Sequence, residues 1–135
     1  MNSILEHIYK TDQVEDAEGN LISAFPVATP YEVGIALNQL ITQENLSNTL
    51  EVGMAYGLST LFFCQAHRDK GTGSHTAIEP WQNGEWKSIG LLNVKRAGME
   101  ELFNFFEAPS YQVLPQLLTI RVTNREYFHR HKIFS

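Results

Sequence analysis

The chain contains very little cysteine: one residue, Cys64, in 135. A single thiol cannot form an intrachain disulfide, which excludes the class of small secreted domains that disulfides hold together. Cys64 lies within an apolar helical pattern, so we interpret it as a small core residue and not as a nucleophile.

Long hydrophobic runs are also missing. No apolar run approaches the roughly 20 residues that are needed to cross a bilayer. The first 20 residues lack the basic, then apolar, then small-residue pattern of a signal peptide. We therefore expect a cytoplasmic protein without a membrane partner.

An excess of positive charge is absent as well. The chain has 10 Lys and Arg against 15 Asp and Glu, a formal net charge of −5. Such an acidic body argues against a nucleic-acid partner, because that function requires cations that neutralise phosphates. The exception is residues 119–135, which hold four basic side chains against one acidic side chain, Glu126. This break in composition predicts an atypical basic tail outside the packed domain.

What is present suffices for one domain, since 43% of the residues are hydrophobic. We place its boundaries at residues 25–118. Residues 1–24 are polar and acidic, with a turn at 16–20, and predict a mobile N-terminal segment.

The apolar pattern within the domain alternates between helical and extended periods. Helices are predicted at 31–43 (with Thr29 as its cap), 57–67, 85–99 and 109–118, and strands at 49–52, 75–78 and 102–106. Alternation of this kind is typical of the α/β class. It predicts a partial Rossmann-like open parallel sheet of about three strands with helices on both faces.

The most informative stretch is residues 49–60, TLEVGMAYGLST. It predicts a buried strand that turns sharply into a helix over Gly53 and Gly57. Glycines at such a turn let the backbone N–H groups approach a ligand, and the helix behind them adds partial positive charge. Ser59 or Thr60 would cap the helix or bind the ligand.

Two further loops are expected at the same sheet edge, where open parallel sheets bind ligands. Glu79 ends the next strand, and its carboxylate can accept two hydrogen bonds from a ribose diol. Trp81 offers a flat apolar surface for a purine. The third loop is residues 107–110. Together these features predict a ribose-bearing cofactor.

Phosphate-binding patterns are missing from the glycine turn. The dinucleotide fingerprint requires G-x-G-x-x-G, whereas the turn reads G-M-A-Y-G, with Ala55 in place of the middle glycine. A phosphate loop of the form G-x-x-x-x-G-K-[ST] is also absent from the sequence. The turn therefore suits a ribose-bearing ligand without a diphosphate.

The pattern Glu51-x-Gly53-x-x-x-Gly57-x-Ser59-Thr60, followed by A-I-E-P-W at 77–81, resembles the class I S-adenosylmethionine-dependent methyltransferases. It is most similar to a bacterial subgroup with an E-x-G-x-x-x-G-x-S-T first motif. The similarity extends over residues 25–118.

The resemblance implies S-adenosylmethionine as the cofactor and a role for each matching residue. Glu51, Gly53 and Gly57 would shape the pocket for its methionine part. Glu79 would bind the ribose hydroxyls, Trp81 would lie near the adenine, and residues 108–110, ending at Ser110, would border the adenine edge.

Methyl transfer to a small molecule is the implied activity, although the sequence indicates no catalytic base and no metal site. Two alternatives remain open: a fragment of a nicotinamide-dependent oxidoreductase, which Ala55 disfavours, and a non-catalytic remnant or interaction module.

The family pattern stops after Leu118, where the expected fourth strand and its aspartate do not follow. Ile120 and Val122 alternate as in an edge strand. We expect a truncated or frameshifted chain that is inactive alone and self-associates through an uncovered sheet edge.

Overall fold

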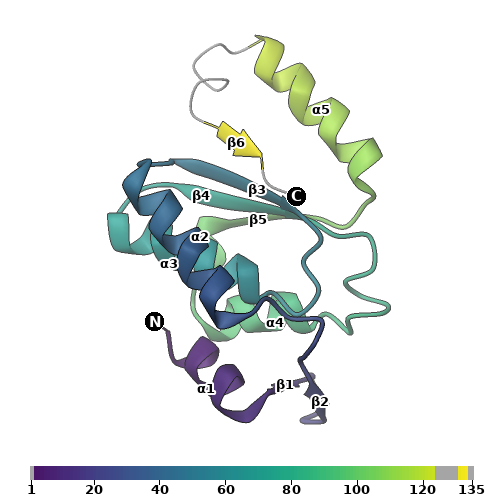
Figure 1. Ribbon diagram of the computed structural model, residues 1–135. Helices are drawn as coiled ribbons and strands as arrows, with labels where there is room; N and C mark the ends of the chain where they lie inside the picture. Colours follow the sequence, from purple (N-terminus) through teal and green to yellow (C-terminus); the bar gives the residue numbers. More distant parts are fainter. Residues whose placement is uncertain (1, 124–130, 134–135) are drawn as a thin grey trace.

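The elements follow one another as in an α/β domain in the computed structural model, which describes residues 2–123 and 131–133 (Figure 1). They are α1 (Ser3–Thr11), β1 (Gln13–Glu15), β2 (Leu21–Ser23), α2 (Tyr31–Gln43), β3 (Asn48–Val52), α3 (Leu58–Lys70), β4 (Ser74–Ile78), α4 (Ile89–Arg96), the 3₁₀ helix η1 (Glu100–Leu102), β5 (Phe103–Phe106), α5 (Ser110–Thr123) and β6 (His131–Ile133).

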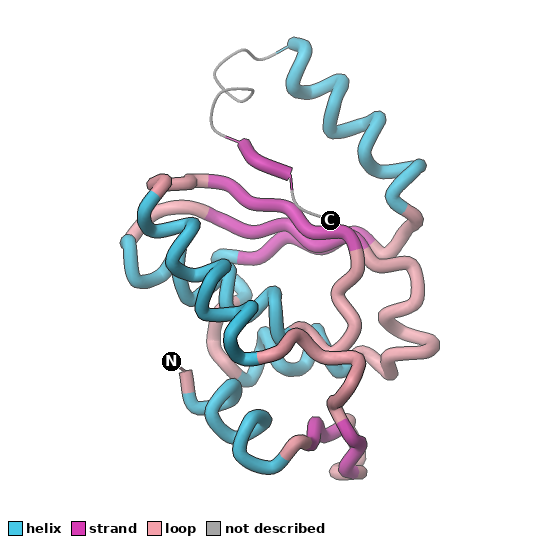
Figure 2. Tube along the Cα trace, in the orientation of Figure 1, coloured by secondary structure: helices cyan, strands magenta, loops and turns pink. Residues whose placement is uncertain are grey.

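A parallel sheet with the strand order β5-β4-β3-β6 forms the centre (Figure 2). Its register pairs Leu50 with Thr76 and His75 with Phe103. The predicted class and the three predicted strands are confirmed. The short β6 pairs with β3 and lies within residues 119–135, so pairing extends beyond the predicted domain.

Helices cover both faces of the sheet, as predicted. α2, α3 and α4 lie on one side and α5 on the other (Figure 1). Alternation along β3 explains this arrangement, because Thr49 and Glu51 point toward α3 while Leu50 packs with Ile78 of β4 and Val113 of α5. β5 is an edge strand, and Phe106 at its end is 37% exposed.

The prediction of an edge strand at residues 120 and 122 is wrong. α5 runs from Ser110 to Thr123 and contains both positions. Two apolar residues separated by one polar residue are too short a pattern to distinguish a strand from a helix. The helix has a topological reason, since a chain that pairs two parallel strands in one sheet must cross over between them.

The expectation of a mobile N-terminal segment is also wrong. Leu5 and Ile8 of α1 and Val14 of β1 are buried in the main hydrophobic cluster. The Asn2 side chain caps α1 by accepting a hydrogen bond from the backbone N–H of Leu5 at 2.9 Å. The predicted turn at residues 16–20 is present and connects β1 to β2.

Helix ends differ from the prediction where glycine or turn geometry intervenes. α3 continues to Lys70 and is closed by Gly71 at φ 80°. α4 is shorter than predicted, because residues 80–88 form successive turns, with Lys87 and Ser88 at positive φ. α2 begins after Pro30 without a side-chain cap, so Thr29 does not cap it.

Cys64 is a core residue, as interpreted from the sequence. Its side chain is fully buried in α3. Burial, followed by the negative charge of Glu51, raises the pKa of its thiol to about 12. Since the thiolate is the reactive form, Cys64 is inert at neutral pH.

Candidate functional site

A cavity of about 290 Å³ lies at the carboxyl ends of β3 and β4. Its wall consists of residues 27–29, the glycine turn with the start of α3 (residues 53–59), Glu79 and Trp86. The volume is near the lower end of the range of small-molecule sites, about 300–1,000 Å³. Its position at the strand ends is the one where open parallel sheets bind ligands.

Glu79 lies directly against the glycine turn. It is 5% exposed, and its Oε1 accepts hydrogen bonds from the backbone N–H groups of Met54 at 3.1 Å and Ala55 at 3.2 Å. Its Oε2 accepts one from the backbone N–H of Trp81 at 3.3 Å. The carboxylate therefore fixes the turn and also faces the cavity.

The two glycines of the turn meet different surroundings. Gly53 has φ 91°, and a Cβ built on it would meet no atom within 4 Å, so the space beside it is open. Gly57 has φ 83°, and its Cβ would lie 3.1 Å from the Cα and O of Gly90. Gly53 thus leaves room on the cavity side, whereas Gly57 allows α4 to pack against the turn.

Ala55 occupies the left-handed region at φ 47°, a conformation that glycine adopts without strain. We predict that Ala55→Gly stabilises the fold by about 0.5–1 kcal/mol, because relief of strain exceeds the added entropy of the unfolded chain. Urea unfolding measures this change. The control is Ala97→Gly, at φ −79°, which should destabilise the fold. Equal losses in both variants would contradict the strain at Ala55.

Glu51 lies behind the first turn of α3 and outside the cavity wall. Its carboxylate accepts hydrogen bonds from the hydroxyls of Ser59, at 2.6 Å, and Thr60, and it lies 3.1 Å from His75 Nε2. Ser59 does line the cavity. Neither hydroxyl caps α3, and Glu51 contacts the site through Ser59.

A buried polar chain continues from Glu51 under the site. His75 Nδ1 lies 2.8 Å from Thr49 Oγ1, which lies 2.9 Å from His67 Nε2. The rings of His75 and Phe63 stack with centroids 4.3 Å apart. Sequence reasoning missed both histidines, although the alternation of Thr49 and Glu51 along β3 was a signal for a polar row on one face.

His67 should make the fold sensitive to acid. Burial first, then the charges of Lys70 and His75, lower its pKa from 6.5 to about 4. Between these values the unfolded chain binds a proton that the folded chain does not. Stability is therefore unaffected above pH 6.5 and falls by about 1.4 kcal/mol per pH unit as the pH drops toward 4.

Urea unfolding of wild type and His67→Gln at pH 7.5, 5.5 and 4.5 tests this prediction. The carboxylates contribute equally to both proteins, so the difference in slope isolates His67. Parallel slopes would contradict the lowered pKa.

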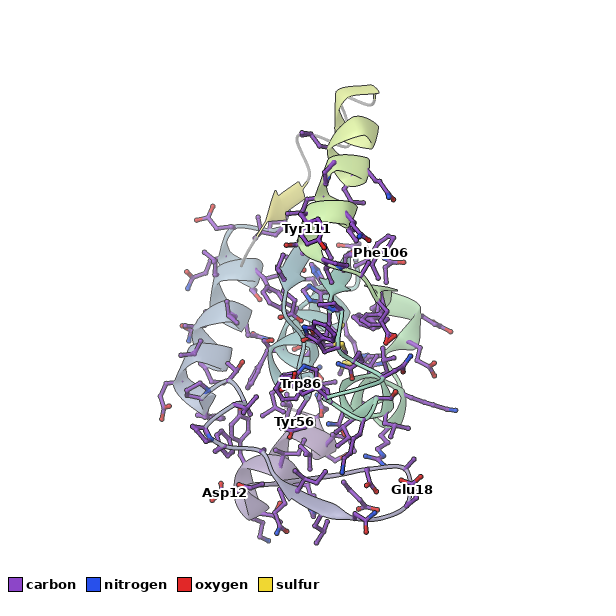
Figure 3. All side chains as sticks on the ribbon, turned by 90° about the vertical axis from the view of Figure 1, so that its right-hand side faces the viewer. Asp12, Glu18, Tyr56, Trp86, Phe106 and Tyr111 are labelled. Atoms are coloured by element: carbon purple, nitrogen blue, oxygen red, sulfur yellow. The ribbon has the colours of Figure 1, made fainter. Side chains whose placement is uncertain are left out.

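The remaining predicted residues lie outside the cavity wall. Trp81 is 61% exposed, and Ser110 begins α5. Trp86 is the tryptophan of the wall, and its ring meets that of Tyr56 edge-on, with centroids 5.3 Å apart (Figure 3). The loop after β5 contacts the loop after β4, since Glu107 accepts hydrogen bonds from the N and Nδ2 of Asn83 at 3.0 and 2.6 Å.

Two negative findings concern only the residues that the structure describes. Among them, no group of three or more His, Cys, Asp or Glu side chains could hold a metal ion. None of the helices in the same ranges is long and apolar enough to span a membrane.

A parallel sheet with a glycine turn after one strand and a carboxylate after the next defines a Rossmann-like ligand-binding domain. A family model described as "Methyltransferase domain" matches residues 50–129, more than half of the chain. The chain therefore belongs to this methyltransferase family, which confirms the resemblance that the motifs predicted.

Individual relatives agree with the family. Caffeoyl-CoA O-methyltransferase 5 of Nicotiana tabacum is 32% identical over 101 residues, covering 75% of this chain and 40% of that protein. An O-methyltransferase from Bacillus cereus in complex with SAH superposes with a TM-score of 0.64 at 20% identity, over 88% of this chain and 49% of that chain. SAH-bound methyltransferase PaMTH1 from Podospora anserina gives 0.65 at 18%, over 84% and 45%. The chain thus spans less than half of each relative.

Proposed function

We propose that the chain binds S-adenosylmethionine in the cavity at the glycine turn and forms the cofactor-binding part of a methyltransferase. The observation that carries this proposal is the Glu79 carboxylate, bound to the backbone of the turn and facing the cavity. Two findings support it. The chain belongs to the methyltransferase family, and two of its structural neighbours are described as bound to SAH.

The cavity wall fits the polar parts of this cofactor. Among the described residues, Glu79 Oε2 accepts a single hydrogen bond, so a carboxylate oxygen retains acceptor capacity for a ribose hydroxyl. The open side of Gly53 leaves room for the ligand, and the Ser59 hydroxyl lies in the same wall. When bound, S-adenosylmethionine supplies an electrophilic methyl group on a sulfonium centre.

The residues of this chain would bind and orient the cofactor. In our proposal Gly53, Gly57, Ser59 and Glu79 contact it, and Glu51 acts from behind by holding Ser59. We also propose that Trp81 and Ser110, which lie outside the cavity wall, contact the cofactor. The positioning of a reactant in this way can supply much of the rate enhancement of a transfer reaction.

The methyl acceptor is proposed to be a small molecule in the cytoplasm. The acidic composition disfavours a nucleic-acid acceptor. The name of the tobacco relative, an O-methyltransferase, supports an acceptor oxygen.

Calorimetric titration of the purified chain with S-adenosylhomocysteine and, separately, with NAD tests the proposal. We expect saturable binding of S-adenosylhomocysteine at one site and no binding of NAD. Binding of NAD alone would favour the oxidoreductase alternative, and binding of neither would favour the non-catalytic alternative. Each of these results would overturn the proposal.

A further inference from the structure

The carbonyl groups of the glycine turn are hydrogen-bonded to side chains, as its N–H groups are. The fully buried Gln82 donates from Nε2 to the Ala55 carbonyl oxygen at 2.9 Å. Asn93, which is 2% exposed, donates from Nδ2 to the Tyr56 carbonyl oxygen at 3.0 Å. Two consecutive carbonyls of the cavity wall thus each accept a hydrogen bond from a buried side-chain amide.

Each of the two amides is also held at its oxygen. Gln82 Oε1 accepts from the backbone N–H of Leu91 at 3.3 Å. Asn93 Oδ1 accepts from Arg96 Nη1 at 3.3 Å. With its oxygen engaged, each amide directs its N–H₂ group toward the turn, so its orientation is defined.

α4 lies so close to the turn that no side chain fits at Gly90. A Cβ built on Gly90 would lie 2.6 Å from the Ala55 carbonyl oxygen and 2.8 Å from Gln82 Oε1. Glycine at this position lets the helix, the glutamine and the carbonyl pack together. The contact is therefore a specific fit between α4 and the turn.

We propose that Gln82 and Asn93 are positioning residues that hold the glycine turn in its ligand-binding shape. This inference rests on the proposed cofactor function. Glu79 fixes the N–H groups of Met54 and Ala55, and the two amides fix the carbonyls of Ala55 and Tyr56. A turn held on both sides loses little conformational freedom when a ligand binds, which raises affinity.

The N-terminal hairpin β1–β2 contacts these positioning residues through Arg96. The guanidinium donates from Nη1 to the Glu15 carbonyl at 2.7 Å and from Nη2 to the Asp16 carbonyl at 3.2 Å. It also donates to Asn93, as described above. The hairpin β1–β2 thereby orients Arg96, which orients the amide under Tyr56.

Gln82→Glu tests the proposal through a pH profile. An ionised carboxylate has no proton to donate to the Ala55 carbonyl, whereas a protonated carboxyl does. We expect the variant to bind S-adenosylhomocysteine about 10-fold more weakly than wild type at pH 8.5. Burial at this position raises the pKa of the new carboxyl, so it is protonated at pH 5.5 and the ratio of the two dissociation constants should approach one there.

The matched control is Gln112→Glu, the same change at an exposed position of α5 outside the cavity wall. Its dissociation constant should equal that of wild type at both pH values. A loss of affinity in Gln82→Glu that does not change with pH, or no loss at all, would overturn the proposal.

Arg96→Met provides a second test that does not disturb the core, because Arg96 is exposed. We expect a loss of affinity of about threefold, together with a lower melting temperature because the hydrogen bonds to the Glu15 and Asp16 carbonyls are lost as well. Unchanged affinity in Arg96→Met would overturn the role of Asn93. The affinity of Gln82→Glu decides the role of Gln82 separately. If wild type itself fails to bind S-adenosylhomocysteine, the proposed function fails instead, so the two failures are distinguishable.

Discussion

Replacement of Glu79 by alanine is expected to weaken binding of S-adenosylhomocysteine by about 100-fold or more. The variant loses the acceptor for the N–H groups of Met54 and Ala55 and the carboxylate that we assign to the ribose. Each hydrogen bond to a charged group contributes about 1.5–3 kcal/mol, and about 1.4 kcal/mol corresponds to tenfold in affinity. Isothermal titration calorimetry measures the loss.

Two further variants make this result specific. Glu79→Gln keeps one acceptor oxygen and should bind with intermediate affinity. Glu101→Ala removes an exposed carboxylate of η1 outside the cavity wall and should bind as wild type does. If Glu79→Ala retained the affinity of wild type, Glu79 would not belong to the binding site.

His75→Leu is expected to lower the free energy of unfolding by about 3 kcal/mol. The imidazole bridges the buried Glu51 carboxylate and Thr49. Without it the carboxylate stays buried with one hydrogen-bond partner fewer, and the loss of a partner from a buried charge is strongly destabilising. Urea unfolding at pH 7.5 measures the effect.

A double-mutant cycle separates this effect from the loss of packing against Phe63. In the background of Glu51→Gln the same His75→Leu change should cost less, because a neutral amide is easier to bury than a carboxylate. We expect a coupling energy of at least about 1 kcal/mol. Additive effects of the two substitutions would contradict the proposed interaction.

The sheet and the glycine turn were predictable because they depend on short-range patterns. The apolar residues of β3 and β4 and the glycines at 53 and 57 define a strand, a turn and a helix within a few residues. The position of Glu79 beside the turn follows from the parallel order of two adjacent strands. These local signals agree with one another, so the fold class could be inferred from them.

The remainder of the cavity wall was not predictable for a physical reason. Residues 80–88 form turns without a hydrophobic period, and Lys87 and Ser88 adopt positive φ. Such geometry decides that Trp86 and not Trp81 faces the cavity. Residues 27–29 reach the wall because α1 and the hairpin pack on the core, which the acidic composition of the segment concealed.

The hydrogen-bonded row of buried polar side chains could be predicted only with the strand register, which the sequence alone does not give. Alternation places Thr49 and Glu51 on one face of β3, but it does not state which residue of β4 lies beside them. The structure pairs Thr49 with His75. A slip of one residue would turn His75 to the other face of the sheet and break the row of hydrogen bonds from Glu51 through His75 to Thr49.

The assignment of the site is tested most directly by ¹⁵N chemical-shift mapping of the chain during titration with S-adenosylhomocysteine. We predict that the largest changes occur at the backbone amides of residues 53–59, Glu79 and Trp86, which line the cavity. Changes confined to other parts of the chain, or no changes at saturating ligand, would show that this turn does not hold the cofactor.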